Sequence, residues 1–220
     1  MSINNKNISN VISIIKDQIK CFDEPSVTMV GKKWNSPFLV LISCLLSLRT
    51  KDEVTLPASE RLFKLAKTPK ELLALDTKLI EKTIFPVGFY KRKAVGIKGV
   101  SRTIIENFNG EVPDNIDELL TLKGVGRKTA NLVLTEGYKK LGICVDTHVH
   151  RISNRFGYVR TGSPNDTEQV LRKKLDKKHW IEYNALLVVW GQNICKPISP
   201  LCSICSIEKY CPKEGVLKSR

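Results

Sequence analysis

Apolar residues recur at three- and four-residue spacing along most of the chain, the pattern of helices that bury one face. Few segments alternate between apolar and polar residues as strands do. The expected helices lie near residues 9–21, 36–48, 57–66, 70–75, 77–84, 91–107, 115–120, 127–136, 147–156, 167–175 and 181–192. The sequence therefore predicts an all-α protein.

Local signals mark some helix starts and a boundary between two lobes. Ser36 before Pro37 is typical of an N-cap followed by an early-helix proline, and residues 114–118 open a helix after Pro113. Glycines at 137 and 142 with the short apolar piece 143–145 interrupt the helical pattern. We therefore expect a lobe boundary near 137–145.

Two glycines separate helical patterns in LTLKGVGRKTANLVL, residues 120–134, with Val125 between Gly124 and Gly126. This arrangement is typical of a helix–hairpin–helix. Glycines permit close approach, so backbone N–H groups of the turn and of the next helix can face a phosphate. An ordinary tight turn between helices is the alternative. Because Arg127 and Lys128 follow in a basic chain, the DNA-binding interpretation is favoured.

The chain has 36 Lys and Arg against 22 Asp and Glu, a formal net charge of +14. Such an excess favours a polyanionic partner. Each basic run alone is typical of a solvated face, but their number favours a nucleic-acid backbone. An anionic membrane surface is a less suitable partner, because the sequence shows no basic amphipathic helix with aromatic anchors. The runs comprise Lys91, Arg92 and Lys93; Arg127 and Lys128; Lys139 and Lys140; and Arg172, Lys173, Lys174, Lys177 and Lys178.

Four cysteines crowd into CKPISPLCSICSIEKYC, residues 195–211. Thiolates on one short loop can converge on a single soft centre, either an iron–sulfur cluster or zinc, and spacing alone does not identify the metal. Two disulfides are the weaker alternative, because residues 1–20 show no signal-peptide pattern and no stretch is long enough to span a bilayer. We expect a soluble intracellular protein with Cys195, Cys202, Cys205 and Cys211 as metal ligands.

Lys128 would lie in the first turn of the helix that follows the hairpin. There the positive end of the helix dipole and neighbouring Arg127 both disfavour a charged amine, which makes a lysine nucleophilic near neutral pH. From this segment alone, contact with a phosphate is an equally good interpretation. Asp146 follows an apolar run and precedes Thr147, as an N-cap does. A carboxylate held this way stays ionised and can also stabilise positive charge on a sugar.

Taken together, GVGRKTAN, VDTH and the C-x6-C-x2-C-x5-C tail resemble endonuclease III, the iron–sulfur branch of the helix–hairpin–helix DNA glycosylases. The resemblance extends from about Phe38 to Cys211 and includes LLSLRTKDEV, VGFYKRKA, NGEVPD and WGQNIC. It implies a two-lobed fold: a six-helix barrel at 27–138 with the hairpin at about 119–134, and a lobe of 1–26 and 139–220 that holds a [4Fe–4S] cluster in the 195–211 loop.

The resemblance also implies a bifunctional DNA glycosylase and AP lyase. Lys128 would attack the deoxyribose C1′ of an oxidised pyrimidine nucleotide, with Asp146 as the catalytic carboxylate, and β-elimination would cut the strand 3′ to the lesion. The implied partner is damaged double-stranded DNA. The resemblance also implies that the protein acts as a monomer and does not bind a membrane. The expected DNA contacts are Gly124, Val125, Gly126, Arg127, Thr129, Arg49 and Phe89, the last two filling the space left by a flipped nucleotide.

Two departures from the family leave finer points open. Many relatives carry glutamine where Arg49 stands, which affects contact with the orphaned base, and the loop between the first two cysteines supplies only Lys196 as a basic residue. Two alternatives remain: a monofunctional mismatch glycosylase, which would leave the strand intact, and a non-enzymatic DNA-binding module with a structural zinc. The lysine at 128 favours the bifunctional enzyme, because related mismatch glycosylases usually carry another residue there.

Overall fold

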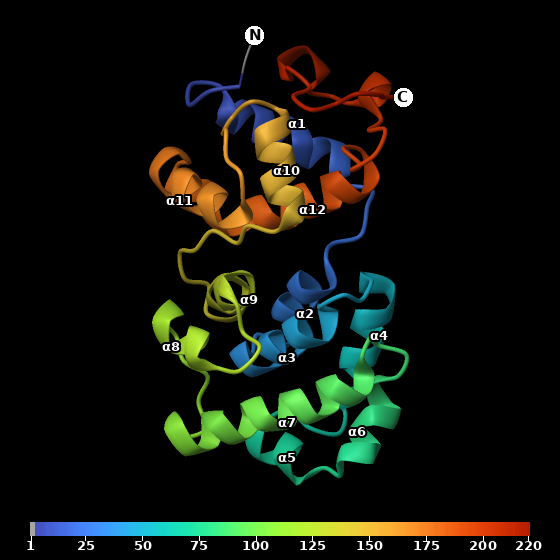
Figure 1. Cartoon of the computed structure of the whole chain (residues 1–220), viewed down its shortest axis with the longest axis vertical. Coiled ribbons are helices and arrows are strands. Elements are labelled where there is room, and N and C mark those ends of the chain that lie inside the picture. Colours follow the sequence, from blue (N-terminus) through green and yellow to red (C-terminus); the bar gives the residue numbers. More distant parts are fainter. Residues whose placement is uncertain (1–2) are drawn as a thin grey trace. The chain divides into compact units, whose positions relative to one another are not determined.

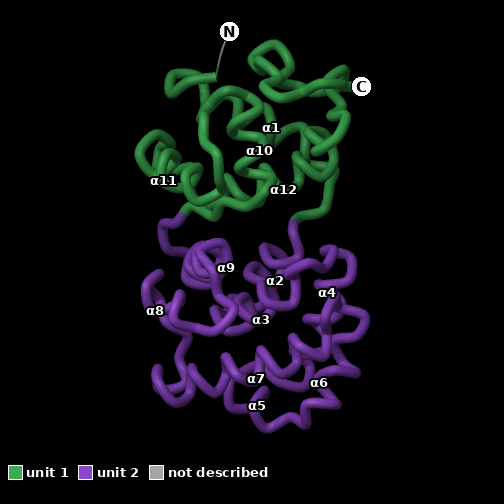
Figure 2. The backbone as a smooth tube through the Cα atoms, viewed as in Figure 1, with its two compact units in different colours: residues 1–24, 143–220 green, residues 25–142 purple. Residues whose placement is uncertain are grey.

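The computed structural model describes residues 3–220, and every regular element in that range is a helix. The prediction of an all-α protein is confirmed. The described chain divides into two compact units (Figure 2). The continuous unit is Pro25–Gly142, and the discontinuous unit combines residues 3–24 with Ile143–Arg220.

The continuous unit consists of short helices joined by polar turns. Helix α7 packs along both α5 and α6 (Figure 1). Its elements are α2 (Ser26–Trp34), α3 (Pro37–Ser47), α4 (Asp52–Phe63), α5 (Pro69–Ala74), α6 (Thr77–Ile84), α7 (Tyr90–Asn107), α8 (Ile116–Thr121), α9 (Arg127–Leu132) and the π-helical turn η1 (Val133–Gly137).

Helix α3 forms the centre of this unit. Nine of its 11 residues are buried, Phe38 to Leu46, because its sequence is apolar on almost every side. Helices α2, α4, α7 and α9 and the turn η1 all contact it. The predicted start is confirmed: the Ser36 hydroxyl accepts a hydrogen bond from the Leu39 N–H at 3.4 Å, and Pro37 follows it.

Two helices in this unit differ from the expectation. Helix α2 was not predicted, since it is short and begins after Pro25 without a side-chain cap. The helix expected near 57–66 begins earlier, at Asp52, and Pro57 lies inside it. Acidic residues at 52 and 53 occupy its first turn, where they favour the helix dipole. The favourable acidic first turn therefore outweighs the destabilising effect of Pro57 inside the helix.

The discontinuous unit builds one core from both parts of its chain. Apolar residues of α1 at positions 8, 11, 12 and 15 pack with a larger set between Ile143 and Ile207. Its elements are α1 (Ile8–Ile19), α10 (Thr147–Arg155), α11 (Pro164–Lys174), η2 (Lys177–His179), α12 (Trp180–Asn193), η3 (Cys202–Ile204) and η4 (Glu208–Tyr210).

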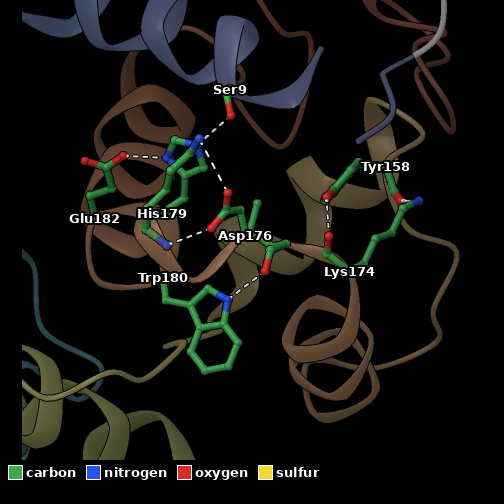
Figure 3. Close-up of polar contacts among 9 residues, drawn as sticks. Ser9, Tyr158, Lys174, Asp176, His179, Trp180 and Glu182 are labelled. Carbon is green, nitrogen blue, oxygen red and sulfur yellow. Dashed lines mark hydrogen bonds and ion pairs between the residues drawn. The ribbon is translucent and has the colours of Figure 1, made fainter. Parts of the chain in front are cut away.

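Polar contacts fix α1 to the start of α12 (Figure 3). The Ser9 hydroxyl lies 2.9 Å from Nε2 of His179, and Nδ1 of the same ring lies 2.9 Å from the Glu182 carboxylate. That carboxylate also pairs with Lys16 at 2.6 Å. Elsewhere in the unit, the hydroxyl of the buried Tyr158 lies 3.0 Å from Oδ1 of Asn5 and 3.1 Å from the Lys174 carbonyl, and its one hydrogen bonds to either oxygen. Residues from the two ends of the sequence therefore hold one another in place.

No helix within residues 3–220 combines the length and the apolar character needed to cross a bilayer.

The central position of α3 predicts a strong effect of truncating its core side chains. We expect Leu46→Ala, at a residue with 0% exposure, to lower the free energy of unfolding by about 2–5 kcal/mol. Leu79→Ala, at a residue with 42% exposure on α6, should cost far less. Urea unfolding followed by circular dichroism measures both, and equal losses would contradict the central role of α3.

Candidate active site and cysteine loop

Helices α8 and α9 are joined by a tight turn over residues 122–126, so the predicted hairpin is confirmed. The Val125 N–H donates to the Leu122 carbonyl at 3.0 Å, and the Val125 side chain is buried. Gly124 has φ +84°, a left-handed conformation that a glycine adopts without strain. Gly126 is the N-cap of α9 and brings no side chain of its own to the first N–H groups.

The hairpin presents Lys128 to solvent on a firmly anchored helix. Lys128 is exposed, whereas the next four residues of α9, Thr129 to Leu132, are buried. Cys44 of α3 lies close enough to Lys128 for their electrostatic interaction to matter. Burial raises the pKa of this thiol to about 12, and the positive charge of Lys128 opposes that shift. The side chain of Lys128 is therefore accessible, while the helix that carries it is anchored by buried neighbours.

Asp146 is the N-cap of α10, as predicted. Its carboxylate accepts hydrogen bonds from the N–H groups of His148 and Val149, both at 2.9 Å, and only 7% of the residue is exposed. These bonds satisfy N–H groups of the first turn and fix the carboxylate orientation. The two nearby histidines bond locally, as expected: Nδ1 of His148 faces Arg151 at 3.2 Å, and Nδ1 of His150 faces Thr167 at 2.7 Å.

Three of the predicted site residues border one pocket of the continuous unit. Arg49, Phe89 and Gly124 line an open pocket of about 350 Å³, together with Lys93. Its remaining described lining residues are apolar or basic, and none is acidic. Lys128 belongs to the same unit, whereas Asp146 belongs to the discontinuous unit. The catalytic and binding roles assigned to these residues stay predictions.

Taken alone, the basic run 91–93 is typical of a solvated face, and Lys93 departs from that pattern because it is half-buried. Burial lowers the pKa of Lys93 to about 8. Its Nζ donates to three oxygens of residues 46–50. The sequence does carry a signal for Lys93. It lies four residues before the buried Ile97, on the face of α7 where apolar residues recur at three- and four-residue spacing.

The four predicted cysteine ligands border one cavity of about 20 Å³ in the discontinuous unit. Cys195 is buried, and the other three are partly exposed. Burial raises the pKa of Cys195 and Cys211, and raises that of Cys205 to about 12. Within residues 3–220, no set of three His, Cys, Asp or Glu side chains has the arrangement of a metal site. The donor set nonetheless suits a soft metal centre, since four thiols of one loop border the same cavity, although Glu208 borders it too.

Two arginines that the sequence did not single out secure this loop to α10. Arg155 donates to the Cys195 sulfur at 3.4 Å and to the Lys196 carbonyl at 2.8 Å. Arg151 donates to the Cys195 carbonyl at 2.9 Å. Both arginines follow the Asp146 cap on the same helix, so the helix that holds the carboxylate also holds the first cysteine.

Comparison with known proteins gives the family. Residues 42–177 match the family model described as HhH-GPD superfamily base excision DNA repair protein. The chain is 48% identical to endonuclease III of Thermotoga maritima over 179 residues, which cover 81% of this chain and 84% of the relative.

Solved structures agree. A trapped covalent intermediate of endonuclease III with DNA is similar, with a TM-score of 0.83, 31% identity and coverage of 96% of this chain and 97% of that one. A thermostable thymine-DNA glycosylase matches with a TM-score of 0.81, 23% identity and coverage of 95% and 97%, which shows a shared fold. The chain belongs to the HhH-GPD superfamily of base excision DNA repair proteins and, within it, to the endonuclease III family.

The cap formed by Asp146 predicts different outcomes for two substitutions. Asp146→Asn should leave the free energy of unfolding within about 0.5 kcal/mol, because asparagine caps as well as aspartate, whereas Asp146→Ala should lower it by about 1 kcal/mol. Asp76 makes the same type of cap on α6, with its carboxylate accepting from the N–H groups of residues 78 and 79. Asp76→Ala is therefore the matched control. Thermal unfolding of the four proteins compares them, and an Asn variant as unstable as the Ala variant would contradict simple capping.

Proposed function

We propose that the protein is a bifunctional DNA glycosylase and AP lyase of base excision repair that removes oxidised pyrimidines. The observation that carries this function is the exposed lysine on the helix that follows the hairpin, in a chain of the endonuclease III family. A relative of the same fold has been trapped as a covalent intermediate with DNA. An accessible amine on an anchored helix is what such chemistry requires.

Damaged double-stranded DNA is the proposed substrate. The net charge of +14 attracts a phosphate backbone, and the hairpin turn can bring its N–H groups close to one. The basic and apolar pocket that includes Arg49 and Phe89 suits a nucleic-acid strand, because a ring and a guanidinium stack on bases. Gly124, Val125, Gly126, Arg127 and Thr129 are the proposed backbone contacts.

The proposed reaction needs one amine and one carboxylate. With the damaged base flipped out of the duplex, the neutral Lys128 amine attacks C1′; the C1′–N bond to the base breaks, and the base leaves with the electron pair and takes up a proton. The C1′–O4′ bond then breaks, O4′ takes up the remaining proton of the lysine nitrogen, and C1′ and that nitrogen form an imine. This imine makes the C2′ proton acidic, and loss of that proton breaks the C3′–O bond. Asp146 would stabilise the positive charge that develops on the sugar.

For the cysteine loop we propose a [4Fe–4S] cluster held by Cys195, Cys202, Cys205 and Cys211. Support comes from the family and from the single cavity that these thiols border. The bound cluster would supply a rigid crosslink and take no part in base removal, because the amine and carboxylate account for the chemistry. The buried Arg155 guanidinium, beside the Cys195 sulfur, would favour negative charge on the thiolates.

The fold by itself does not separate this function from a monofunctional mismatch glycosylase, since a thymine-DNA glycosylase shares it. The lysine at 128 is the residue that favours the bifunctional enzyme. Action as a monomer and a location inside the cell stay predictions.

Covalent trapping tests the proposed nucleophile. Borohydride should reduce the imine and join the protein to DNA containing an oxidised pyrimidine, and Lys128→Gln should abolish the adduct because an amide cannot form it. Lys82→Gln, at an exposed lysine of α6 in the same unit, should still be trapped. Excised base without adduct or strand cleavage would establish the monofunctional alternative. Asp146→Asn, which keeps the cap, should slow excision by about 10²-fold.

Metal analysis tests the proposed cluster. Protein purified without oxygen should contain about four iron atoms per chain and show visible charge-transfer absorbance. Cys202→Ser should remove most of the iron and lower the melting temperature, because one ligand is lost. Cys21→Ser, at an exposed cysteine outside the loop, should change neither. Bound zinc in place of iron, with no visible absorbance, would overturn the cluster and leave a structural zinc site.

A further inference from the structure

Lys93 is a charged side chain enclosed by oxygens at the end of α3. Its Nζ donates to the carbonyls of Leu46 and Leu48 at 2.7 and 2.5 Å, and to the Thr50 hydroxyl at 3.0 Å. The last carbonyls of a helix have no partner within the helix, and a cation satisfies them well. Lys93 therefore fixes the segment that leaves α3, although it comes from α7.

The Thr50 hydroxyl extends this network to a second segment. It accepts from Lys93, accepts from the Gly88 N–H at 3.1 Å, and lies 3.4 Å from the Leu48 carbonyl, to which it donates. A hydroxyl offers one hydrogen and two lone pairs, so its capacity is used completely. Residues 48–50 and residues 88–89 are thereby joined through one side chain.

These two segments also touch through their backbones. A Cβ at Gly88 would lie 2.8 Å from the Arg49 carbonyl oxygen, which is closer than atoms in contact can approach. Only glycine permits this approach. The network of Lys93 and Thr50 therefore acts on two segments that already approach each other closely.

Each segment presents one exposed side chain in an unusual conformation. Arg49 and Phe89 have φ values of 54° and 58°, in the left-handed region that such residues rarely adopt. The Arg49 guanidinium lies over the Phe89 ring at 5.1 Å from its centroid. The ring is 53% exposed beside the basic pocket. Backbone conformations of this kind persist where surrounding contacts impose them.

We propose that Lys93 is a positioning residue for base excision: through Thr50 it holds the Arg49–Phe89 pair in the geometry in which that pair replaces a base extruded from the duplex. The inference rests on the proposed function. A planar ring with a stacked guanidinium can take the place of a base between its neighbours. The rigidity of the Arg49–Phe89 pair matters for the free energy of base extrusion. If the pair had to be ordered on binding DNA, the entropy lost would reduce how much of the unstacking free energy it offsets.

The test compares two substrates. Lys93→Met keeps most of the side-chain volume and loses all three hydrogen bonds. It should slow excision of a paired oxidised pyrimidine in duplex DNA by about tenfold or more, because duplex extrusion costs a few kcal/mol. Cleavage at a preformed abasic site in single-stranded DNA, where no base must be extruded, should stay within about twofold of the unmodified protein. Equal losses on both substrates would overturn the inference.

A double-mutant cycle shows whether Lys93 acts through the pair. If it does, Lys93→Met combined with Phe89→Ala should excise no more slowly than Phe89→Ala alone. Additive losses would overturn the inference. Thr50→Val, which breaks the link to Gly88 and keeps Lys93, should reproduce the substrate split, and Thr50→Ser should restore excision. These milder variants decide the matter if Lys93→Met does not fold.

Lys98 provides the matched control on the same helix. It donates to the Leu75 carbonyl at the end of α5, so Lys98→Met removes an equivalent cation from another helix terminus. Its substrate ratio should equal that of the unmodified protein; the same split as for Lys93→Met would overturn the inference. Failure of the unmodified protein to excise any lesion would instead reject the proposed function. An active protein whose Lys93→Met variant matches it on both substrates would reject the inference alone.

Discussion

Burial of α3 on nearly every side is the constraint on which the continuous unit depends. Its residues Phe38 to Leu46 have no solvent-facing side, so the surrounding helices must cover it completely. The hydrophobic effect pays for that enclosure, and polar atoms at the helix end must then be satisfied from outside. That requirement explains why a lysine of α7 reaches the carbonyls that end α3. The same enclosure holds α9 against Cys44 and leaves Lys128 at the surface.

The discontinuous unit solves a similar problem with polar contacts at helix ends. Asp146 satisfies the first N–H groups of α10, and Arg151 and Arg155 on that helix satisfy carbonyls of the cysteine loop. A single helix thus carries the carboxylate at its start and the support for Cys195 further along. Any change that rotates α10 would disturb both, which links the folding of the loop to the position of the carboxylate without any shared chemical step.

Local rules were sufficient where one segment determines its own structure. Ser36 with Pro37, the glycine turn at 124 and the Asp146 cap were all predictable, because caps and turns depend on a few adjacent residues. Helix α2 was missed because its stability comes from packing on α3 and α4. Lys93 and Arg155 were missed for another reason: their partners lie far away in sequence. The place of Lys93 on the apolar face of its helix indicates that it can be enclosed, but not which oxygens enclose it.

The discontinuous core has a consequence for how the molecule is made. Helix α1 carries Ile8, Val11, Ile12 and Ile15, whose packing partners begin at Ile143. On the ribosome, α1 emerges first and its apolar face stays uncovered until those late partners appear. The intervening unit, residues 25–142, is compact by itself and can fold meanwhile. A polypeptide truncated after that unit would expose the apolar face of α1, which chaperones and proteases can recognise.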